Sequence, residues 1–220
     1  MITNRAQTIS RVAAITLLAL AISTSVAAQP KPKSSFGLLL DSTGSMRSQF
    51  DTVLAIGKAI VHETASRGPT SIFNFESEGI GKPNAMPVLR LEQSQNEAIL
   101  NRTIDGLYVE GGQTTFLDAI QFISDHLQEW APDSDKVIVV VSDGEDRVSK
   151  TKSKDLIQQL KERKIRVFTV GLVQDLDTGK RSKATKLLTT LSSETGGRAV
   201  FPEGIVNVQK ALKELALPTE

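Results

Sequence analysis

The chain has 220 residues, of which 40% are apolar and 23% charged, a balance typical of a soluble globular protein and too polar for one with many membrane spans. Its formal net charge of +1 indicates neither a basic surface for nucleic acid nor a polybasic patch for a membrane. The absence of Cys excludes disulfides, thiolate metal sites and a lipid-modified N-terminal Cys.

Residues 1–28 predict a secretory signal peptide. Arg5 and Arg11 precede an apolar stretch over residues 12–22, and the small residues that end at Ala28 are typical of a signal-peptidase cleavage site. The alternative is an uncleaved anchor, but a membrane span needs about 20 apolar residues and this stretch is shorter. We therefore expect a secreted or periplasmic protein whose mature chain has no membrane span and carries 24 of the 26 basic side chains with all 25 acidic ones.

The mature chain is expected to consist of a short linker and one domain. Residues 29–35 are polar and contain two prolines, which favours a linker, and the domain then covers residues 36–217. Six segments have the composition of strands: Phe36–Leu40, Ser71–Phe75, Val88–Leu91 (a short edge strand), Lys136–Val141, Ile165–Val170 and Ala199–Phe201.

Helical patterns lie between these strands. The clearest runs from Phe116 to Leu127, with apolar residues three or four positions apart, and residues 94–97 read as a capping box opening another helix. Strands that alternate with crossover-length helices require right-handed βαβ units. The sequence therefore predicts a doubly wound α/β fold with a mostly parallel central sheet and helices on both faces.

Oxygen-bearing side chains follow the first predicted strand at alternate positions. Asp41, Thr43 and Ser45 come directly after the apolar run that ends at Leu40, and Gly44 is expected to let their loop curl. Oxygen ligands without His or Cys suit Mg²⁺, Mn²⁺ or Ca²⁺ and not zinc or copper. An alternative is that these side chains merely cap the following helix.

Two further polar loops are expected at the same edge of the sheet, because parallel strands present their carboxyl ends there. Asp143 follows the apolar strand that ends at Val141, and Thr114 lies in a polar loop before the clearest helix. Two carboxylates and up to three hydroxyls would hold a near-octahedral cation and leave a position for water or a partner.

Three segments closely resemble the von Willebrand factor type A domain with its metal-ion-dependent adhesion site. They are Asp41–Ser45, Gly112–Thr114 followed by Asp118–Ile120, and Val139–Asp146, and the resemblance extends from about Phe36 to Leu215. It implies a doubly wound, Rossmann-like fold and a site for Mg²⁺ or Mn²⁺.

The resemblance also implies roles for individual residues. The positions that match Thr43, Ser45 and Thr114 touch the metal directly or through water, and those that match Asp41 and Asp143 often act through water. Thr43 stands where Ser is usual but retains the hydroxyl, and the choice of Thr114 over Thr115 follows the family spacing. The residues expected to support these ligands are Ser42, Gly44, Ser142 and Asp146, and the alternative for Asp146 is a solvated loop charge.

These features predict an exported binding module that captures a protein partner through a divalent cation bridging to a carboxylate of that partner, without chemistry of its own. One alternative is a Mg²⁺-dependent phosphatase or hydrolase that uses Asp41 as nucleophile. Such chemistry normally requires a second carboxylate, acting as acid or base, at the position where this chain has Thr43. Another is a structural assembly subunit whose site is never filled. The sequence indicates no particular oligomeric state.

Overall fold

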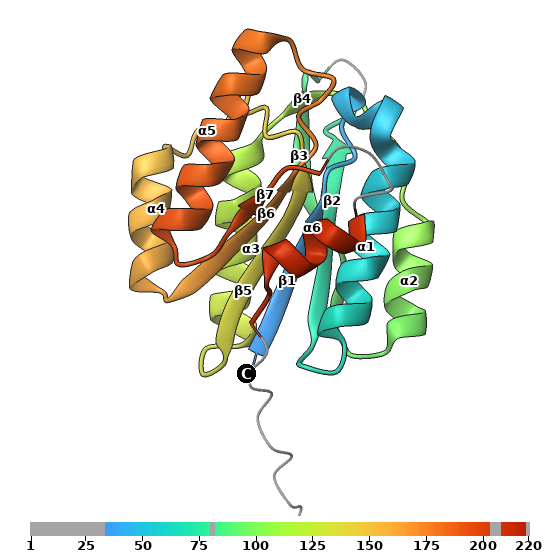
Figure 1. Ribbon diagram of the computed structural model, residues 1–220, viewed down its shortest axis with the longest axis vertical. Helices are drawn as coiled ribbons and strands as arrows, with labels where there is room; N and C mark the ends of the chain where they lie inside the picture. The colour runs from blue at the N-terminus through green and yellow to red at the C-terminus, as the bar shows by residue number, and fades with distance from the viewer. Residues whose placement is uncertain (1–33, 80–81, 203–207, 219–220) are drawn as a thin grey trace, which may run out of the picture. The chain divides into compact units, whose positions relative to one another are not determined.

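A computed structural model describes residues 34–79, 82–202 and 208–218 (Figure 1). The predicted signal peptide and most of the predicted linker lie outside these residues. The strands are β1 (Ser34–Leu40), β2 (Thr70–Ser77), β3 (Asn84–Ser94), β4 (Gln113–Thr114), β5 (Asp135–Ser142), β6 (Ile165–Gly171) and β7 (Ala199–Val200). The helices are the 3₁₀ helix η1 (Gly44–Gln49), α1 (Phe50–Thr64), α2 (Glu97–Asp105), α3 (Phe116–Trp130), α4 (Ser153–Glu162), α5 (Thr178–Glu194) and α6 (Val208–Leu215).

The seven strands seen in the described ranges form one sheet in the order β4-β3-β2-β1-β5-β6-β7. All pairings are parallel except that of β2 with β3. At the centre, Leu39 of β1 lies opposite Phe73 of β2 on one side and Val140 of β5 on the other. The predicted doubly wound, mostly parallel sheet is therefore confirmed.

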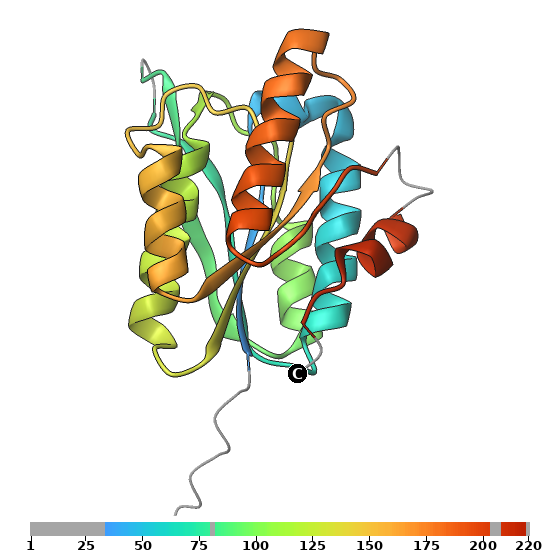
Figure 2. The same cartoon turned by 60° about the vertical axis from the view of Figure 1, so that its left-hand side comes forward.

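Helices cover both faces of the sheet, with α3, α4 and α5 on one face and α1, α2 and α6 on the other (Figures 1 and 2). Side chains along β1 alternate between the two layers: Leu38 and Leu40 belong to the core under α1, whereas Leu39 belongs to the core under α3. Each of these fully buried leucines contributes roughly 2 kcal/mol of burial free energy. Burial on both faces explains why β1 and β5 read as continuous apolar runs.

One glycine allows the close approach of a helix to the sheet. A Cβ on Gly37 of β1 would lie 2.4 Å from Cγ2 of Ile123 in α3. Because β1 carries Asp41 at its carboxyl end, this contact helps to hold the candidate site against α3.

The structure corrects several boundaries. β1 begins at Ser34, so the last two residues of the predicted linker belong to the strand, and β3 is much longer than the predicted edge strand. The predicted capping box is wrong: Asn96 is the N-cap of α2, and its Oδ1 accepts hydrogen bonds from the N–H groups of Ala98 and Ile99. The side chain of Asn96 thus satisfies two of the backbone donors at the first turn of α2, whereas the Ser94 hydroxyl accepts from the N–H of Asn96 before the helix begins.

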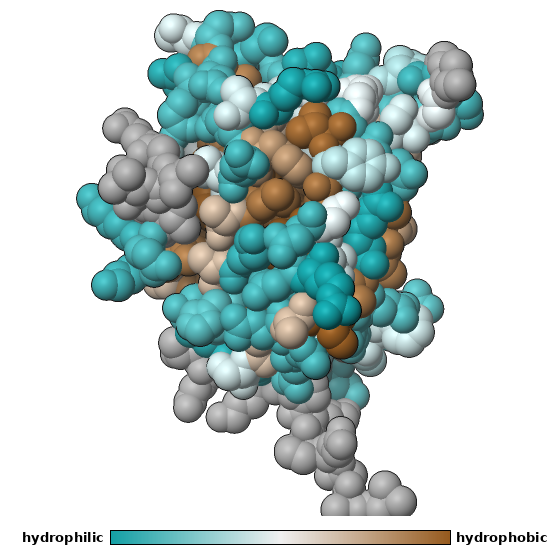
Figure 3. Space-filling view, turned by 90° about the vertical axis from the view of Figure 1, so that its right-hand side faces the viewer, coloured by the Kyte–Doolittle hydropathy of each residue, from teal (hydrophilic) through white to brown (hydrophobic). Residues whose placement is uncertain are grey.

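The side of the molecule formed by α1 and α2 shows apolar side chains among polar ones (Figure 3). Phe50, Leu54 and Ala59 are only partly covered where they pack on the core, and Ile99 of α2 is exposed. Across the described part of the chain, every helix is too short or too polar to cross a membrane.

Candidate metal centre

The loop that leaves β1 gathers three oxygen-bearing side chains at the carboxyl edge of the sheet. Asp41 is fully buried, and its Oδ1 accepts hydrogen bonds from the N–H (3.0 Å) and the Oγ1 hydroxyl (2.7 Å) of Thr43. The Oγ atom of Ser45 lies 3.3 Å from Oγ1 of Thr43. Thr43 precedes η1 but its side chain makes no capping hydrogen bond, so the helix-cap alternative is wrong for this residue.

The second polar loop reaches the first through Thr114. Its Oγ1 hydroxyl donates to Oγ1 of Thr43 at 3.2 Å, whereas the hydroxyl of Thr115 donates away from the site, to the carbonyl of Ala85 at 2.8 Å. The geometry therefore favours Thr114 over its neighbour.

The third loop contributes Asp143, which is 2% exposed. Its Oδ1 accepts a hydrogen bond from the N–H of Glu145 at 2.9 Å, while its Oδ2 is buried without a hydrogen-bond partner. The Ser45 hydroxyl interacts with the Asp143 side chain, although burial keeps the pKa of that carboxyl raised. The structure thus brings together all five residues for which ligand roles are predicted: Asp41, Thr43, Ser45, Thr114 and Asp143.

Two buried carboxylates make this site electrostatically strained. Desolvation, followed by the charge of Asp143, raises the pKa of Asp41 from 3.8 to about 6, although hydrogen bonds from Ser142 and Thr43 oppose the rise. Desolvation also raises the pKa of Asp143, against the N–H of Glu145 and the hydroxyl of Ser45. Both shifts mean that the protein disfavours negative charge here unless a positive charge joins it.

The residues present fit a hard divalent cation. The unpartnered Oδ2 of Asp143 is a buried acceptor that lacks a donor, and carboxylates with hydroxyls are the ligands that Mg²⁺ and Mn²⁺ prefer. No group of three or more His, Cys, Asp or Glu side chains is placed to hold a metal in the part of the chain that the structure describes. A cation at this site would therefore depend on the hydroxyls as well as on the two carboxylates.

The residues expected to support the ligands differ in what they do. Ser142 supports Asp41 directly, because its hydroxyl donates to Oδ2 of Asp41 at 2.5 Å and accepts from the N–H of Gly144. Ser42 does not reach the site: its hydroxyl donates to the carbonyl of Phe75 and so fastens the loop to β2.

The loops need glycine at two positions other than the predicted one, namely Gly112 (φ +102°) before Thr114 and Gly144 after Asp143. Gly44 does not adopt a positive φ, and a Cβ there would meet only the carbonyl oxygen of Glu110 at an ordinary 3.8 Å. Gly144, by contrast, has φ +74°, and a Cβ there would lie 2.9 Å from Leu188. The left-handed backbone that favours glycine thus follows Asp143 and not Thr43.

Asp146 caps helix α3 from another loop. Its Oδ1 accepts hydrogen bonds from the N–H of Phe116 (3.1 Å) and from the hydroxyl of Ser149 (2.5 Å), and that hydroxyl accepts from the N–H groups of Leu117 and Asp118. These donors at the first turn of a helix have no partner within the helix itself. The network ties the loop of Asp143 to the loop of Thr114.

Sequence reasoning missed Ser149 and the carboxylate of Asp118, which accepts from the N–H groups of Lys150 and Thr151. Asp118 lies in one of the segments that resemble the family but received no role of its own, and Ser149 lies outside those segments. Only the proximity of the two loops in space shows that Ser149 satisfies the start of α3.

Comparisons with known proteins agree with this architecture. A family profile described as von Willebrand factor type A domain matches residues 37–214. The chain matches none of the curated protein sequences with which it was compared.

Similar solved structures share the fold at low sequence identity. They include von Willebrand factor type A from Catenulispora acidiphila (TM-score 0.60, 16% identity, 83% of this chain and 41% of that one). The pilus adhesin SpaC from Lactobacillus rhamnosus GG, in its open conformation, has a TM-score of 0.61, 14% identity and coverage of 86% of this chain and 30% of that one. The conserved hypothetical protein BatB from Bacteroides thetaiotaomicron has a TM-score of 0.59, 14% identity and coverage of 82% and 95%. The chain thus spans less than half the length of the first two.

Proposed function

The chain belongs to the von Willebrand factor type A family, and from this premise we propose that it is a protein-interaction module that captures its partner through a divalent cation, Mg²⁺ or Mn²⁺. The residues proposed to hold the cation are Asp41, Thr43, Ser45, Thr114 and Asp143. When bound, the cation would supply the positive charge that attracts a carboxylate of the partner. One of the similar structures is a pilus adhesin, which is in keeping with a binding role.

The observation that carries this proposal is the buried Oδ2 of Asp143, which has no hydrogen-bond partner and lies in the same site as the buried carboxylate of Asp41. A buried acceptor of this kind is costly unless a donor or a cation satisfies it. The hydroxyls of Thr43, Ser45 and Thr114 add neutral oxygens without adding negative charge.

The hydrogen bonds of Asp41 favour this role over the phosphatase alternative. Both of its carboxylate oxygens accept hydrogen bonds, and the side chain has no exposed surface. A nucleophilic aspartate needs an oxygen that a substrate can approach. Thr43 also leaves the neighbouring position without a carboxylate that could act as acid or base.

The proposal is tested by titrating the full chain with Mg²⁺ and following heat and thermal stability. We expect saturable binding of one ion and a higher melting temperature in the wild-type protein, and loss of both in Asp143→Ala. The matched control is Asp105→Ala, because Asp105 is an exposed carboxylate that pairs with Lys58 outside the site. A wild-type protein with no Mg²⁺ response would refute the metal-dependent role.

We further propose that the module works outside the cytoplasm, in the periplasm or the medium, after residues 1–28 are removed. The basis is the pattern of Arg5 and Arg11 before a short apolar stretch. N-terminal sequencing of the protein from its native exported fraction is expected to begin at or next to Gln29. A chain that still begins at Met1 would count against export by this route.

A further inference from the structure

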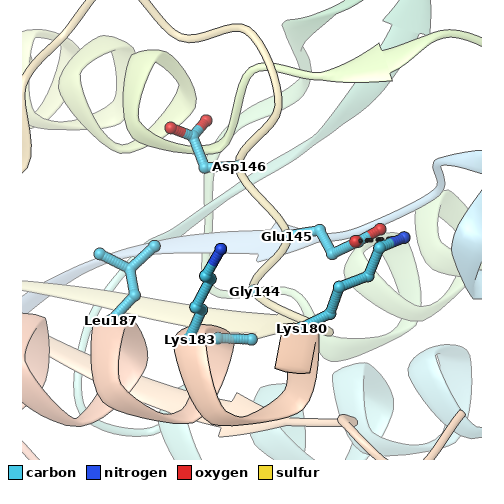
Figure 4. A pocket seen from close by; sticks show the side chains of 7 residues that line it. Gly144, Glu145, Asp146, Lys180, Lys183 and Leu187 are labelled. Atoms are coloured by element: carbon cyan, nitrogen blue, oxygen red, sulfur yellow. Dashed lines mark ion pairs between the residues drawn. The ribbon is translucent and has the colours of Figure 1, made fainter. Parts of the chain in front are cut away.

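A small pocket adjoins the proposed metal centre, between the loop after β5 and helix α5 (Figure 4). Its volume is about 250 Å³. The loop contributes Gly144, Glu145 and Asp146, and α5 contributes Lys180, Lys183 and Leu187. Because Gly144 directly follows Asp143, a partner that places one side chain at the metal centre lies next to this pocket.

Most charges that line the pocket have partners within the chain. Glu145 pairs with Lys180 (Nζ to Oε1, 3.0 Å) and with Arg147 (Nη2 to Oε2, 2.5 Å). Asp146 accepts the hydrogen bonds that cap α3. Glu145 is therefore paired with two cations, and the carboxylate of Asp146 is directed at the first turn of α3.

Lys183 is different. Its side chain rises from α5 toward the loop that carries Gly144 and Asp146 (Figure 4). It is exposed, and its amine has no ion pair or hydrogen bond to any residue that the structure describes. Leu187, one turn further along α5, adds an apolar wall beside it. The pocket thus offers one uncompensated cation above a partly apolar surface.

The sequence of α5 makes this cation costly to the protein. After the N-cap Asp177, the first half of the helix carries four cations and no acid before Glu194: Lys180, Arg181, Lys183 and Lys186. Lys183 lies three residues from both Lys180 and Lys186, and like charges on neighbouring turns destabilise a helix.

Two of these cations have a role inside the protein. Lys180 pairs with Glu145, and Arg181 donates to the carbonyl groups of Val173 and Leu176. Neither Lys183 nor Lys186 has a contact of this kind in the described ranges, and of the two only Lys183 lines the pocket. An anion from outside the chain could therefore pair with Lys183 in the pocket.

We infer that the pocket binds a second carboxylate of the same partner, on an acidic residue two positions from the one that approaches the metal. This inference rests on the proposed function and adds the recognition of an acidic pair to it. Side chains two residues apart in an extended segment point to the same face and are separated by about 7 Å, so one short segment reaches two adjoining sites. Lys183 is then the residue that sets specificity.

The test uses two fluorescent peptides with the full-length chain in excess Mg²⁺: acetyl-Glu-Ala-Asp-Ala-Glu-amide and acetyl-Gln-Ala-Asp-Ala-Gln-amide. Both offer one central carboxylate, and only the first offers a second carboxylate on the same face for the pocket. The wild-type protein is expected to bind the acidic peptide about five-fold more tightly, the upper range for a partly exposed ion pair. Equal affinities in the wild-type protein would overturn the inference.

Variants of α5 then locate the preference. Lys183→Glu and the milder Lys183→Gln are both expected to abolish it. The matched control is Lys186→Glu, which changes the net charge equally on an exposed position of the same helix outside the pocket, and is expected to retain the preference. An equal loss in the Lys186 variant would mean that only the overall charge matters and would overturn the inference.

The same peptides separate this inference from the proposed function. Peptide binding that persists in EDTA, or no binding of either peptide in Mg²⁺, refutes the metal-bridged site itself. Mg²⁺-dependent binding with no preference for the acidic peptide refutes only the role of Lys183.

Discussion

Replacing Asp41 by Asn is expected to stabilise the metal-free protein and to remove its response to Mg²⁺. In the wild-type protein, burial and the charge of Asp143 raise the pKa of Asp41 from 3.8 to about 6. One pKa unit corresponds to about 1.4 kcal/mol, so ionised Asp41 destabilises the metal-free fold by about 3 kcal/mol at neutral pH. The Asn side chain has nearly the same shape and carries no charge.

The gain is partly offset at Ser142. The Oδ1 carbonyl of Asn still accepts from Thr43, but its amide donates where Oδ2 of Asp41 accepts the Ser142 hydroxyl. The loss of that acceptor costs about 1 kcal/mol. The net stabilisation is about 2 kcal/mol, which for a domain of this size raises the melting temperature by about 6 °C.

The assay is thermal unfolding in EDTA over a range of pH. Because folding raises the pKa of Asp41, the wild-type protein becomes less stable as the pH rises from 3.8 toward about 6. Above about 6 the destabilisation by Asp41 has reached its full value. The advantage of Asp41→Asn should therefore be full at neutral pH and disappear near pH 3.8. Added Mg²⁺ should stabilise only the wild-type protein.

Asp118→Asn provides a control of opposite sign. Although desolvation raises the pKa of Asp118, hydrogen bonds from Thr151 and from the N–H of Lys150 lower it overall. The ionised form is the one that the fold favours, so Asn should destabilise at neutral pH. The reasoning is refuted if Asp41→Asn melts at or below the wild-type temperature in EDTA at neutral pH.

Three further predictions concern single positions. Burial lowers the pKa of His126, so the unfolded chain takes up a proton before the folded one as the pH falls through 6.5. The free energy of unfolding of the wild-type protein, measured in urea, should therefore decline relative to that of His126→Gln over this range. Equal pH dependence of the two proteins would contradict this prediction. Gly144→Ala should cost about 1–3 kcal/mol, because it strains a positive φ and meets Leu188, and should weaken the Mg²⁺-induced rise in melting temperature; an unchanged unfolding midpoint would contradict the strain. Ser149→Ala should cost about 1 kcal/mol in chemical denaturation, because α3 loses an acceptor at its first turn, whereas Ser149→Thr should retain most of the stability.

The order of the elements was predictable because burial on two faces leaves a clear trace in the sequence. The inner residues of β1 (Phe36–Leu40) and of β5 (Val137–Val141) form runs without a polar side chain, and the spacing over α3 marks one buried side of a helix. β3 was less predictable, since it is partly exposed along most of its length and carries Arg90 among its apolar residues. β4 has only two residues, too few for any periodicity, and forms because the edge of β3 lies beside it.

The five candidate ligands were predictable as oxygen-bearing residues at strand ends, and their role in binding a cation remains a proposal. The sequence by itself determined which loops carry these oxygens, because the strand pattern dictates where each loop begins. Only the tertiary structure decided which of them meet: Thr114 and Thr43 are 71 residues apart in the chain, and Ser142 and Asp41 are 101 apart. The tertiary structure also decided that Thr115 and Ser42 donate away from the site, because a side chain at the carboxyl edge of a sheet bonds to whichever loop packs beside it. Burial raises the pKa of Asp41 for the same reason, since only the packed loops exclude water from its carboxylate.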